Sequence, residues 1–433
     1  MYSLKGSPKE GFWGATLGFF IGFAAVSLFG PAAAKFKDAM QLSPVMVGIL
    51  VAMPSLSGSI LRIPFSAWVD TTGGRKPFLV LLAFSIIGML ALSLVIFILY
   101  PDHLNVHFYP LLLLLGLLSG CGIATFSVGI SQVSYWFPQK RQGTALGTYA
   151  GIGNIAPGVF SFLLPIALRG LGLGGAYLAW LIFLVAGTGL YFMMGKNAWY
   201  FQLRYQGASP DEAKNIAAKN GQEVFPAGSL TESLLLSART RKTWILVAVY
   251  FTTFGGFIAL TAWLPIYWKS FYNVTIVNAG FLTALYSILT SVIRIGGGVI
   301  SDKFGGERTA ILSLFVMLIG AILMTLSRNF RLSVFAEILM AVGMGVGNAA
   351  VFKLVPQKIP QAIGGAAGWV GGLGALGGFV VPPLMGSFVR ISGINGYAQG
   401  FSVFIILGLI SIIVVSILSG GMEGEDITQR SAE

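Results

Sequence analysis

Charged residues are scarce in this 433-residue sequence, in which only 10% of the residues are charged and 55% are hydrophobic. The mean hydropathy of +0.82 excludes an ordinary soluble globular protein and predicts a polytopic membrane protein. The apolar runs are about 20 residues long and lack the period-two alternation of membrane-spanning strands. The predicted fold class is therefore all-α.

Residue types that bind metals and cofactors are also scarce. The single cysteine, Cys121, lies inside an apolar run, which excludes a disulfide framework and a cysteine-ligated metal site. His103 and His107 stand four residues apart in a short turn, but a pair of imidazoles without a third ligand does not make a metal site. No nucleophile and base pair and no cofactor fingerprint is present, so we expect no enzyme, no metal and no cofactor. The formal net charge is +12, yet the basic residues lie in short turns and form no continuous basic face, which argues against nucleic acid as a partner.

Twelve apolar runs are long enough to cross a bilayer as helices. A polar segment at 196–242 separates the first six from the last six. We therefore predict an N-terminal six-helix bundle at 1–195, a cytosolic linker at 196–242 and a C-terminal six-helix bundle at 243–433, with a regulatory or partner-binding role as the alternative for the linker. The runs fall at 12–34, 44–69, 77–100, 108–136, 142–168, 174–195, 243–268, 274–300, 309–327, 332–353, 361–389 and 396–420.

The basic residues between the runs predict the orientation in the membrane. With the amino terminus inside the cell, sixteen Lys and Arg residues fall on the cytosolic side and seven on the external side. Because basic residues accumulate in cytosolic loops, both termini are predicted to be cytosolic, in the inner or plasma membrane.

Two arginines stand inside apolar runs in matched positions. Arg62 and Arg294 are 232 residues apart, and Asp70 and Asp302 repeat at the same offset, about 12 Å further along a helix. A second offset of 218 relates Pro138 to Pro356 and several glycines of the two halves. These ordered matches predict two pseudo-symmetric halves of six helices each.

A buried arginine needs a counter-charge, because a cation near the centre of a membrane helix costs roughly 3 kcal/mol on insertion scales. The apolar runs offer few acidic residues: Glu337 is predicted near the outer end of its run, and no other Asp or Glu stands mid-run. We therefore predict that Arg62 and Arg294 face one anionic ligand, whose flat oxyanion suits the planar guanidinium fork. Structural arginines neutralised by carboxylates are the alternative.

The turns after these two helices contain a recurring charge pattern. Asp70 is followed by Gly74-Arg75-Lys76, which resembles the loop motif of the major facilitator superfamily, and Asp302 to Arg308 is a looser copy. We predict a cytosolic latch of Asp70, Arg75, Asp302 and Arg308, whose ion pairs break as the two halves rock. A plain topogenic turn is the alternative.

Two glycine-rich runs, 147–160 and 364–379, lie in the fifth and eleventh predicted helices. Glycines at three- and four-residue spacing make a smooth face on which helices pack. Together with the paired arginines, these runs resemble the signatures of the nitrate/nitrite porter family, and the resemblance covers essentially the whole chain. Ala150 is a departure, since that family commonly has glycine there. The signature glycines expected to pack helices are Gly147, Gly151, Gly153, Gly371 and Gly374.

The resemblance implies the substrate and the residues around it. Nitrate or nitrite would be held by Arg62 and Arg294, flanked by aromatic rings of the fourth and seventh helices, with the fifth-helix asparagine as an amide donor. In this sequence the flanking residues are Phe126, Tyr250 and Phe254, and the asparagine is Asn154.

The expected function is nitrate/nitrite antiport by a monomer embedded in the lipid bilayer. Two unpaired arginines in a low-dielectric site disfavour closure without an anion, and no mid-membrane carboxylate or histidine is available to carry a proton. Proton-coupled nitrate symport, exchange of a small carboxylate such as formate or oxalate, and anion sensing without transport are the alternatives.

Overall fold

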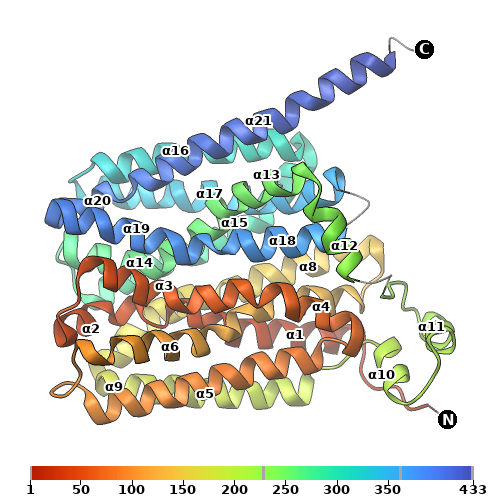
Figure 1. The fold of residues 1–433 in the computed structure, drawn as a ribbon, viewed down its shortest axis with the longest axis horizontal. Helices are drawn as coiled ribbons and strands as arrows, with labels where there is room; N and C mark the ends of the chain where they lie inside the picture. Colours follow the sequence, from red (N-terminus) through yellow and green to blue (C-terminus); the bar gives the residue numbers. More distant parts are fainter. Residues whose placement is uncertain (1, 227–229, 360–362, 431–433) are drawn as a thin grey trace.

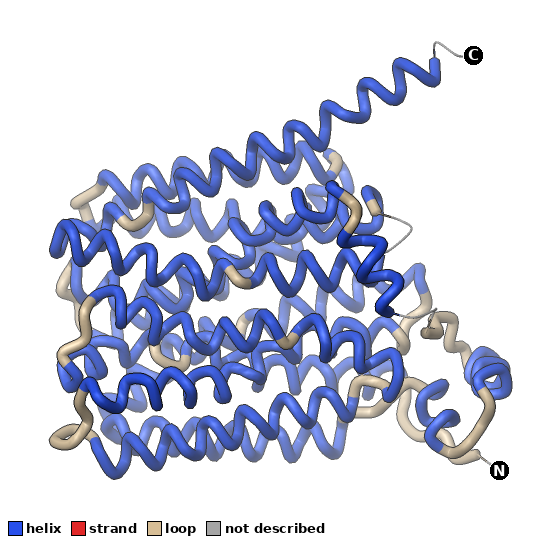
Figure 2. The backbone as a smooth tube through the Cα atoms, viewed as in Figure 1, coloured by secondary structure: helices blue, strands red, loops and turns tan. Residues whose placement is uncertain are grey.

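The structure is a computed structural model that describes residues 2–226, 230–359 and 363–430. Helices make up nearly all of it, and the described residues contain no strand (Figure 2). The helices run side by side as one bundle, with the first half of the chain on one side and the second half on the other (Figure 1).

Helix starts in this bundle are set by local sequence. Ser7 and Glu10 form a capping box at the first helix, where the Ser7 Oγ accepts from the Glu10 N–H and the Glu10 carboxylate accepts from the Ser7 N–H. The hydroxyls of Ser43 and Thr275 cap the second and eighth predicted helices in the same way, each accepting from a backbone N–H three residues on.

The first half of the chain supplies six membrane-spanning segments. The fifth and sixth segments meet within one long helix, which is broken at Gly172, where the φ of 69° is non-helical. The segments are α1 (Pro8–Phe23) with α2 (Ala33–Met40), α3 (Pro44–Ile60) with α4 (Arg62–Thr72), α5 (Arg75–Leu99), α6 (Tyr109–Ser119) with α7 (Thr125–Ser134), and α8 (Gln139–Asn154) with α9 (Ala156–Met194).

The second half supplies six more. Ten helices of the described chain are long and apolar enough to span a membrane; the break at Gly172 divides one of them into two, and the shorter apolar stretch Ser402–Leu418 completes twelve. The segments are α13 (Arg241–Tyr250) with α14 (Gly256–Phe271), α15 (Ile276–Phe304), α16 (Gly306–Leu326), α17 (Phe330–Lys358), α18 (Ile363–Ala375) with α19 (Gly377–Ser392) and α20 (Gly396–Gln399), and α21 (Ser402–Arg430).

Three short helices occupy the polar segment between the halves. Figure 1 shows them at one end of the bundle, near the amino terminus, and we call this end the polar end. The division of the chain at 196–242 stays a prediction. The helices are α10 (Trp199–Tyr205), α11 (Pro210–Lys219) and α12 (Leu230–Ala238).

At the end away from the polar end, the halves touch backbone to backbone. A Cβ on Gly48 of α3 would lie 2.5 Å from the Pro382 carbonyl oxygen of α19, and one on Gly280 of α15 would lie 2.3 Å from the Ser161 oxygen of α9. Glycine is required at such contacts, because any side chain would push the helices apart. Near the polar end, a Cβ on Gly147 of α8 would meet nothing within 4 Å. The bundle is therefore closed at one end and looser at the polar end.

Several helices are interrupted about midway along the bundle (Figure 2). The helix pairs α3/α4, α8/α9 and α18/α19 break at Leu61, Ile155 and Leu376. The remaining interruptions are the 3₁₀ turns η1 (Ala24–Ser27) and η4 (Gly120–Ala124) and the π-helical turn η5 (Phe251–Gly255). Such irregular turns free backbone groups and are common at functional sites.

Candidate functional site

Arg62 is the first residue of α4 and is completely buried. Its Nε donates to the Gly58 carbonyl oxygen at 3.1 Å and its Nη1 to the Gly371 carbonyl oxygen at 2.9 Å, so the guanidinium joins the first half to α18 of the second. Its Nη2 is buried and has no hydrogen-bond partner among the described residues. A buried cationic donor without a partner is costly, which marks Nη2 as a position for an anion.

Arg294 lies in the continuous helix α15 and is partly buried. Its Nη2 donates to the Tyr250 hydroxyl oxygen at 3.4 Å, a long bond within the same half of the chain. Its Nη1 is buried without a partner in the described part of the structure. Arg294 therefore also has one unused donor.

One aromatic ring lies against both guanidinium groups. The Phe254 centroid is 5.2 Å from the Arg62 Cζ and 5.5 Å from the Arg294 Cζ. The two cations are thus no farther apart than the sum of these distances. Each arginine also has a ring of its own, Phe126 at 4.9 Å for Arg62 and Phe352 at 5.6 Å for Arg294. Cation–π attraction of this kind orients guanidinium groups where water is absent.

The π-helical turn η5 positions the shared ring. Phe254 lies in η5 and stacks on Tyr250 one turn earlier, with centroids 4.8 Å apart and an interplanar angle of 10°. Both side chains are fully buried. The structure therefore brings Arg62, Arg294, Phe126, Tyr250 and Phe254 together around one point between the halves.

A serine stripe precedes each arginine on the same helix face. Ser55 and Ser59 stand seven and three residues before Arg62, and Ser287 and Ser291 stand at the same spacings before Arg294. All four serines are buried, and the hydroxyls of Ser55, Ser59 and Ser287 have no partner among the described residues. The 232-residue offset contains this repeat, which the sequence analysis above missed. Hydroxyls at this spacing line one helix face with polar groups that fit an anion.

Asn154 ends α8 at the break before α9 and is buried. Its carbonyl oxygen accepts from the Ser291 Oγ at 2.9 Å, which ties α8 to α15 of the other half. Its side-chain Oδ1 has no partner in the described chain. The predicted contact of the Asn154 amide with the substrate stays a prediction.

The signature glycines occupy three different surroundings. A Cβ on Gly153 would clash with the Phe19 ring, and one on Gly374 would lie 2.7 Å from the Tyr250 ring. These two glycines therefore allow an aromatic ring to pack against the helix backbone. A Cβ on Gly151 would lie 3.1 Å from the Ile295 Cδ1, across the two halves. Gly147 faces open space. Gly371 offers its carbonyl oxygen to Arg62, and a Cβ on Gly371 would meet no atom closer than the Phe352 Cζ at 3.8 Å. Dense helix packing therefore does not describe all five.

Ile63 and Ile295 directly follow the two arginines and cross between the halves. A Cβ on Gly372 of α18 would lie 2.9 Å from Ile63 Cγ1 of the first half. Gly151 of α8 faces Ile295 of the second half in the same way. Each glycine run thus receives the isoleucine beside the other half's arginine.

The carboxylates of the predicted latch have partners other than those expected. The Tyr135 hydroxyl donates to Asp70 Oδ1 at 2.6 Å, whereas Arg75 donates to the Phe192 carbonyl oxygen at 2.7 Å. Asp70 and Arg75 therefore form no ion pair with each other in this conformation, and the latch, whose pairs are expected to break and re-form, stays a prediction. The reason is local: α4 ends at Thr72, and the Arg75 side chain lies against the end of α9.

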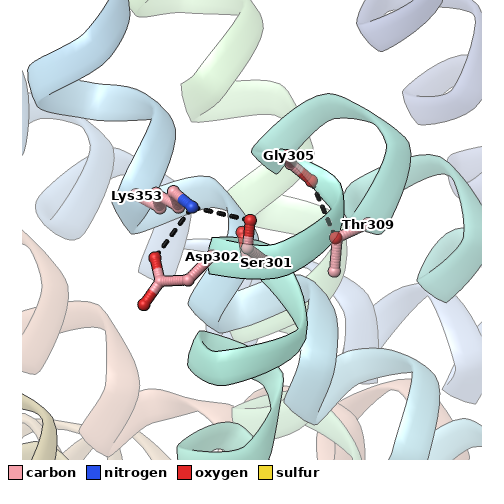
Figure 3. A network of polar contacts seen from close by, with 5 residues as sticks. All are labelled: Ser301, Asp302, Gly305, Thr309 and Lys353. Atoms are coloured by element: carbon pink, nitrogen blue, oxygen red, sulfur yellow. Dashed lines mark hydrogen bonds and ion pairs between the residues drawn. The ribbon is translucent and has the colours of Figure 1, made fainter.

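The second latch carboxylate forms an ion pair with a different helix. The Lys353 Nζ lies 2.8 Å from Asp302 Oδ1 and also donates to the Ser301 carbonyl oxygen at 2.6 Å (Figure 3). Asp302 is therefore paired with Lys353 of α17 in this conformation, and a latch pair with Arg308 stays a prediction. Tyr135 and Lys353 are related by the 218-residue offset, so matched positions hold the two carboxylates.

Glu337 is enclosed by neighbouring side chains. It is seven residues into α17, near one end of that 29-residue helix as expected, and only 1% of its surface is exposed. Its Oε1 accepts from the Trp268 Nε1 at 3.0 Å, and its Oε2 is buried without a partner among the described residues. The complete burial of this carboxylate was not expected from the sequence.

Comparisons with known proteins identify the family and the fold. The family model described as Major Facilitator Superfamily matches residues 15–382 and 272–432. The chain is 30% identical to a probable nitrate transporter NarT of Staphylococcus epidermidis, covering 92% of this chain and 94% of that protein. It is 32% identical to a probable nitrate/nitrite antiporter NarK1 of Thermus thermophilus, covering 93% and 89%. A crystal structure of a D-xylose–proton symporter superimposes with a TM-score of 0.71 over 94% of this chain and 96% of that one, at 14% identity, which shows a common fold.

Proposed function

The chain belongs to the nitrate/nitrite porter family of the major facilitator superfamily, with twelve transmembrane helices in two pseudo-symmetric halves, and we propose that it transports nitrate and nitrite by alternating access. The single observation that carries the proposal is the pair of guanidinium groups around Phe254, each with one buried donor that has no partner among the described residues.

The chemistry of this pair fits a small planar anion. Nitrate is flat, singly charged and weakly hydrated, so two planar donor forks and neighbouring aromatic rings can replace its water. Arg62 is fixed by two carbonyl oxygens, which leaves its Nη2 in a defined position. The anion would bridge Arg62 Nη2 and Arg294 Nη1 against the edge of the Phe254 ring.

Antiport is the finer proposal. The two ion pairs in the described part of the chain, Asp302–Lys353 and Glu307–Lys358, involve neither arginine. Two like charges in a low-dielectric site repel when no anion is present, which disfavours the return step of an empty carrier. An anion on the way back removes that repulsion, so uptake of nitrate would be coupled to release of nitrite.

The orientation is also proposed. The basic residues concentrate on the side of the polar end, which supports a cytosolic polar end and cytosolic termini in the plasma membrane. Because the closest backbone contacts of Gly48 and Gly280 join the halves at the other end, the conformation would be inward-facing.

Proton-coupled symport is a second candidate, and the buried Glu337 favours it. A carboxyl inside a membrane helix with an unused oxygen is a natural proton site. Against it, the described contacts of Glu337 are with Trp268, on the second half alone, and not with either arginine.

Reconstituted liposomes separate these candidates. Antiport predicts rapid uptake of labelled nitrate only when nitrite or nitrate is inside, with no response to a proton gradient, in both the wild type and Glu337→Gln. Proton-driven uptake into empty liposomes that disappears in Glu337→Gln would replace antiport with symport. Competition by formate or oxalate as strong as by nitrite would instead assign a carboxylate substrate. Counterflow of labelled nitrate excludes a sensor that does not transport.

A further inference from the structure

A large cavity lies at the polar end, away from the paired arginines. Its volume is about 1220 Å³, and its walls come from the start of α5, the end of α9, α10 and the amino-terminal segment. We call it the α5–α10 cavity. None of the residues around the arginine pair lines it, so it is a separate site.

The charge on the walls is of one sign. Five basic residues line the α5–α10 cavity, and no Asp or Glu is among its described lining residues. The Arg75 Nε is buried and has no hydrogen-bond partner in the described chain. Five cations around one cavity with no acidic lining residue repel one another, so an anion in their midst would lower the energy of the site. The basic residues are Lys5, Arg75, Lys76, Lys196 and Arg204.

The opposite wall is apolar and continues onto the lipid-facing surface. Leu79, Val80 and Ala83 line it from α5, and Phe192 lines it from α9, with its ring 4.7 Å from the Arg75 guanidinium carbon. Beyond the cavity the same two helices expose large apolar side chains, including Ile87 at 55%. A free inorganic anion would gain nothing from the apolar wall, whereas an amphipathic anion would contact both the basic residues and the apolar wall.

The walls are held in place by side-chain amides. Gln202 donates to the Lys5 carbonyl oxygen at 2.7 Å and accepts from the Lys5 N–H at 2.8 Å, and Gln206 holds Ser3 in the same two-bond manner. Asn197 accepts from the Arg75 N–H and donates to the Thr72 carbonyl oxygen. The cavity is therefore a built feature of the fold and not a gap between loose loops.

We propose that the α5–α10 cavity binds an anionic glycerophospholipid. Its phosphate would lie among the five cations, and an acyl chain would follow the apolar groove between α5 and α9. Because the cavity includes Thr71 and Thr72, next to Asp70, the bound lipid would also stabilise the turn between α4 and α5. The proposal does not depend on the transported substrate.

Native mass spectrometry of the purified protein tests the proposal, with dioleoyl-phosphatidylglycerol as the probe and dioleoyl-phosphatidylcholine as its neutral counterpart. The test variant is K5Q/K196Q/R204Q, and the matched control K9Q/K214Q/K219Q removes three exposed lysines near the same end. Each lost cation weakens attraction to an anionic lipid by about fivefold, so phosphatidylglycerol binding should fall about a hundredfold in the test variant. The control should stay within about twofold.

Equal phosphatidylglycerol binding by the wild type and the test variant would overturn the proposal. So would equal binding of the two lipids by the wild type. If glycerol 3-phosphate alone binds as tightly as phosphatidylglycerol, the site recognises a soluble phosphate and the lipid is wrong. Should the triple variant fail to fold, Lys5→Gln alone is expected to show a loss of about fivefold.

Discussion

The two halves present the same serine stripe and arginine, yet they hold the arginine differently. Arg62 is fully buried and bonded to the Gly371 carbonyl oxygen of the other half, whereas Arg294 is partly buried and, among the described residues, bonded to Tyr250 of its own half. If the halves rotate against each other, the Arg62–Gly371 bond must break, but the Arg294–Tyr250 bond can persist. The repeat therefore places the same charge in both halves, but the two arginines differ in their bonds. The Arg62 bond depends on the relative position of the halves, and the Arg294 bond does not.

Replacing either arginine by lysine should give the largest effect. Arg62→Lys and Arg294→Lys keep the positive charge but lose the planar fork, so nitrate exchange in liposomes should fall about a hundredfold or more, as expected when a bidentate charged contact is lost. Arg390→Lys, at an exposed arginine, is the control and should exchange at the wild-type rate. Full activity in either buried variant would remove the two-arginine site.

The loss of nitrate affinity on replacing each of the three rings should increase with the number of guanidinium groups that the ring contacts. Phe254→Leu removes contacts with both guanidinium groups, so nitrate affinity should fall about tenfold, a loss of about 1.4 kcal/mol. Phe126→Leu and Phe352→Leu each remove one contact and should cost about threefold. Affinity is measured by nitrate binding to the purified protein. Equal losses in all three variants would mean that Phe254 is not shared.

The two latch carboxylates should respond differently to salt. Tyr135→Phe removes a short bond to the half-buried Asp70 and should lower the stability by about 2 kcal/mol at any ionic strength. Lys353→Met removes an ion pair whose Asp302 side chain is 77% exposed, so its cost should be below about 1 kcal/mol and vanish in high salt. Thermal unfolding of the solubilised protein at low and high salt measures both. A salt-dependent Tyr135→Phe effect would contradict the distinction.

The serine stripes should show the smallest difference. Ser291→Ala removes bonds to the Asn154 and Ser287 carbonyl oxygens and should lower stability by about 1 kcal/mol. Ser59→Ala removes a hydroxyl that has no partner among the described residues, so stability should stay unchanged or rise slightly. The same thermal unfolding assay measures the pair, and a destabilised Ser59→Ala protein would indicate a bond that forms in another conformation.

The repeat in the sequence was enough to predict the paired arginines, because a buried cation is costly and a matched pair is rare. The twelve runs followed from hydropathy alone, including the separation of 142–168 from 174–195, which the backbone places at Gly172. Tyr135 and Lys353 are also related by the 218-residue offset. Because they are different residue types, a search for identical residues at that offset does not find them.

Other features depend on rotation about the helix axis, which a sequence does not specify. Phe352 lies one residue before Lys353 and joins the Arg294 site only because α17 presents that face inward. The Arg75 side chain lies within reach of both Asp70 and the end of α9, and only packing selected α9. The burial of Glu337 depends on which helices pack against its face of α17, which hydropathy does not specify.

The π-helical turn η5 makes the position of Phe254 depend on the number of residues in the turn as well as on their types. It holds one residue more than an α-helical turn would, so deleting a single residue such as Thr252 would restore regular winding. The flanking helices α13 and α14 would then keep their orientation, and the change would be confined to the turn itself. Phe254 lies in that turn, so its ring would shift relative to the arginines although no contacting residue had been replaced. Insertions and deletions in Phe251–Gly255 should thus be tolerated less well than most substitutions there.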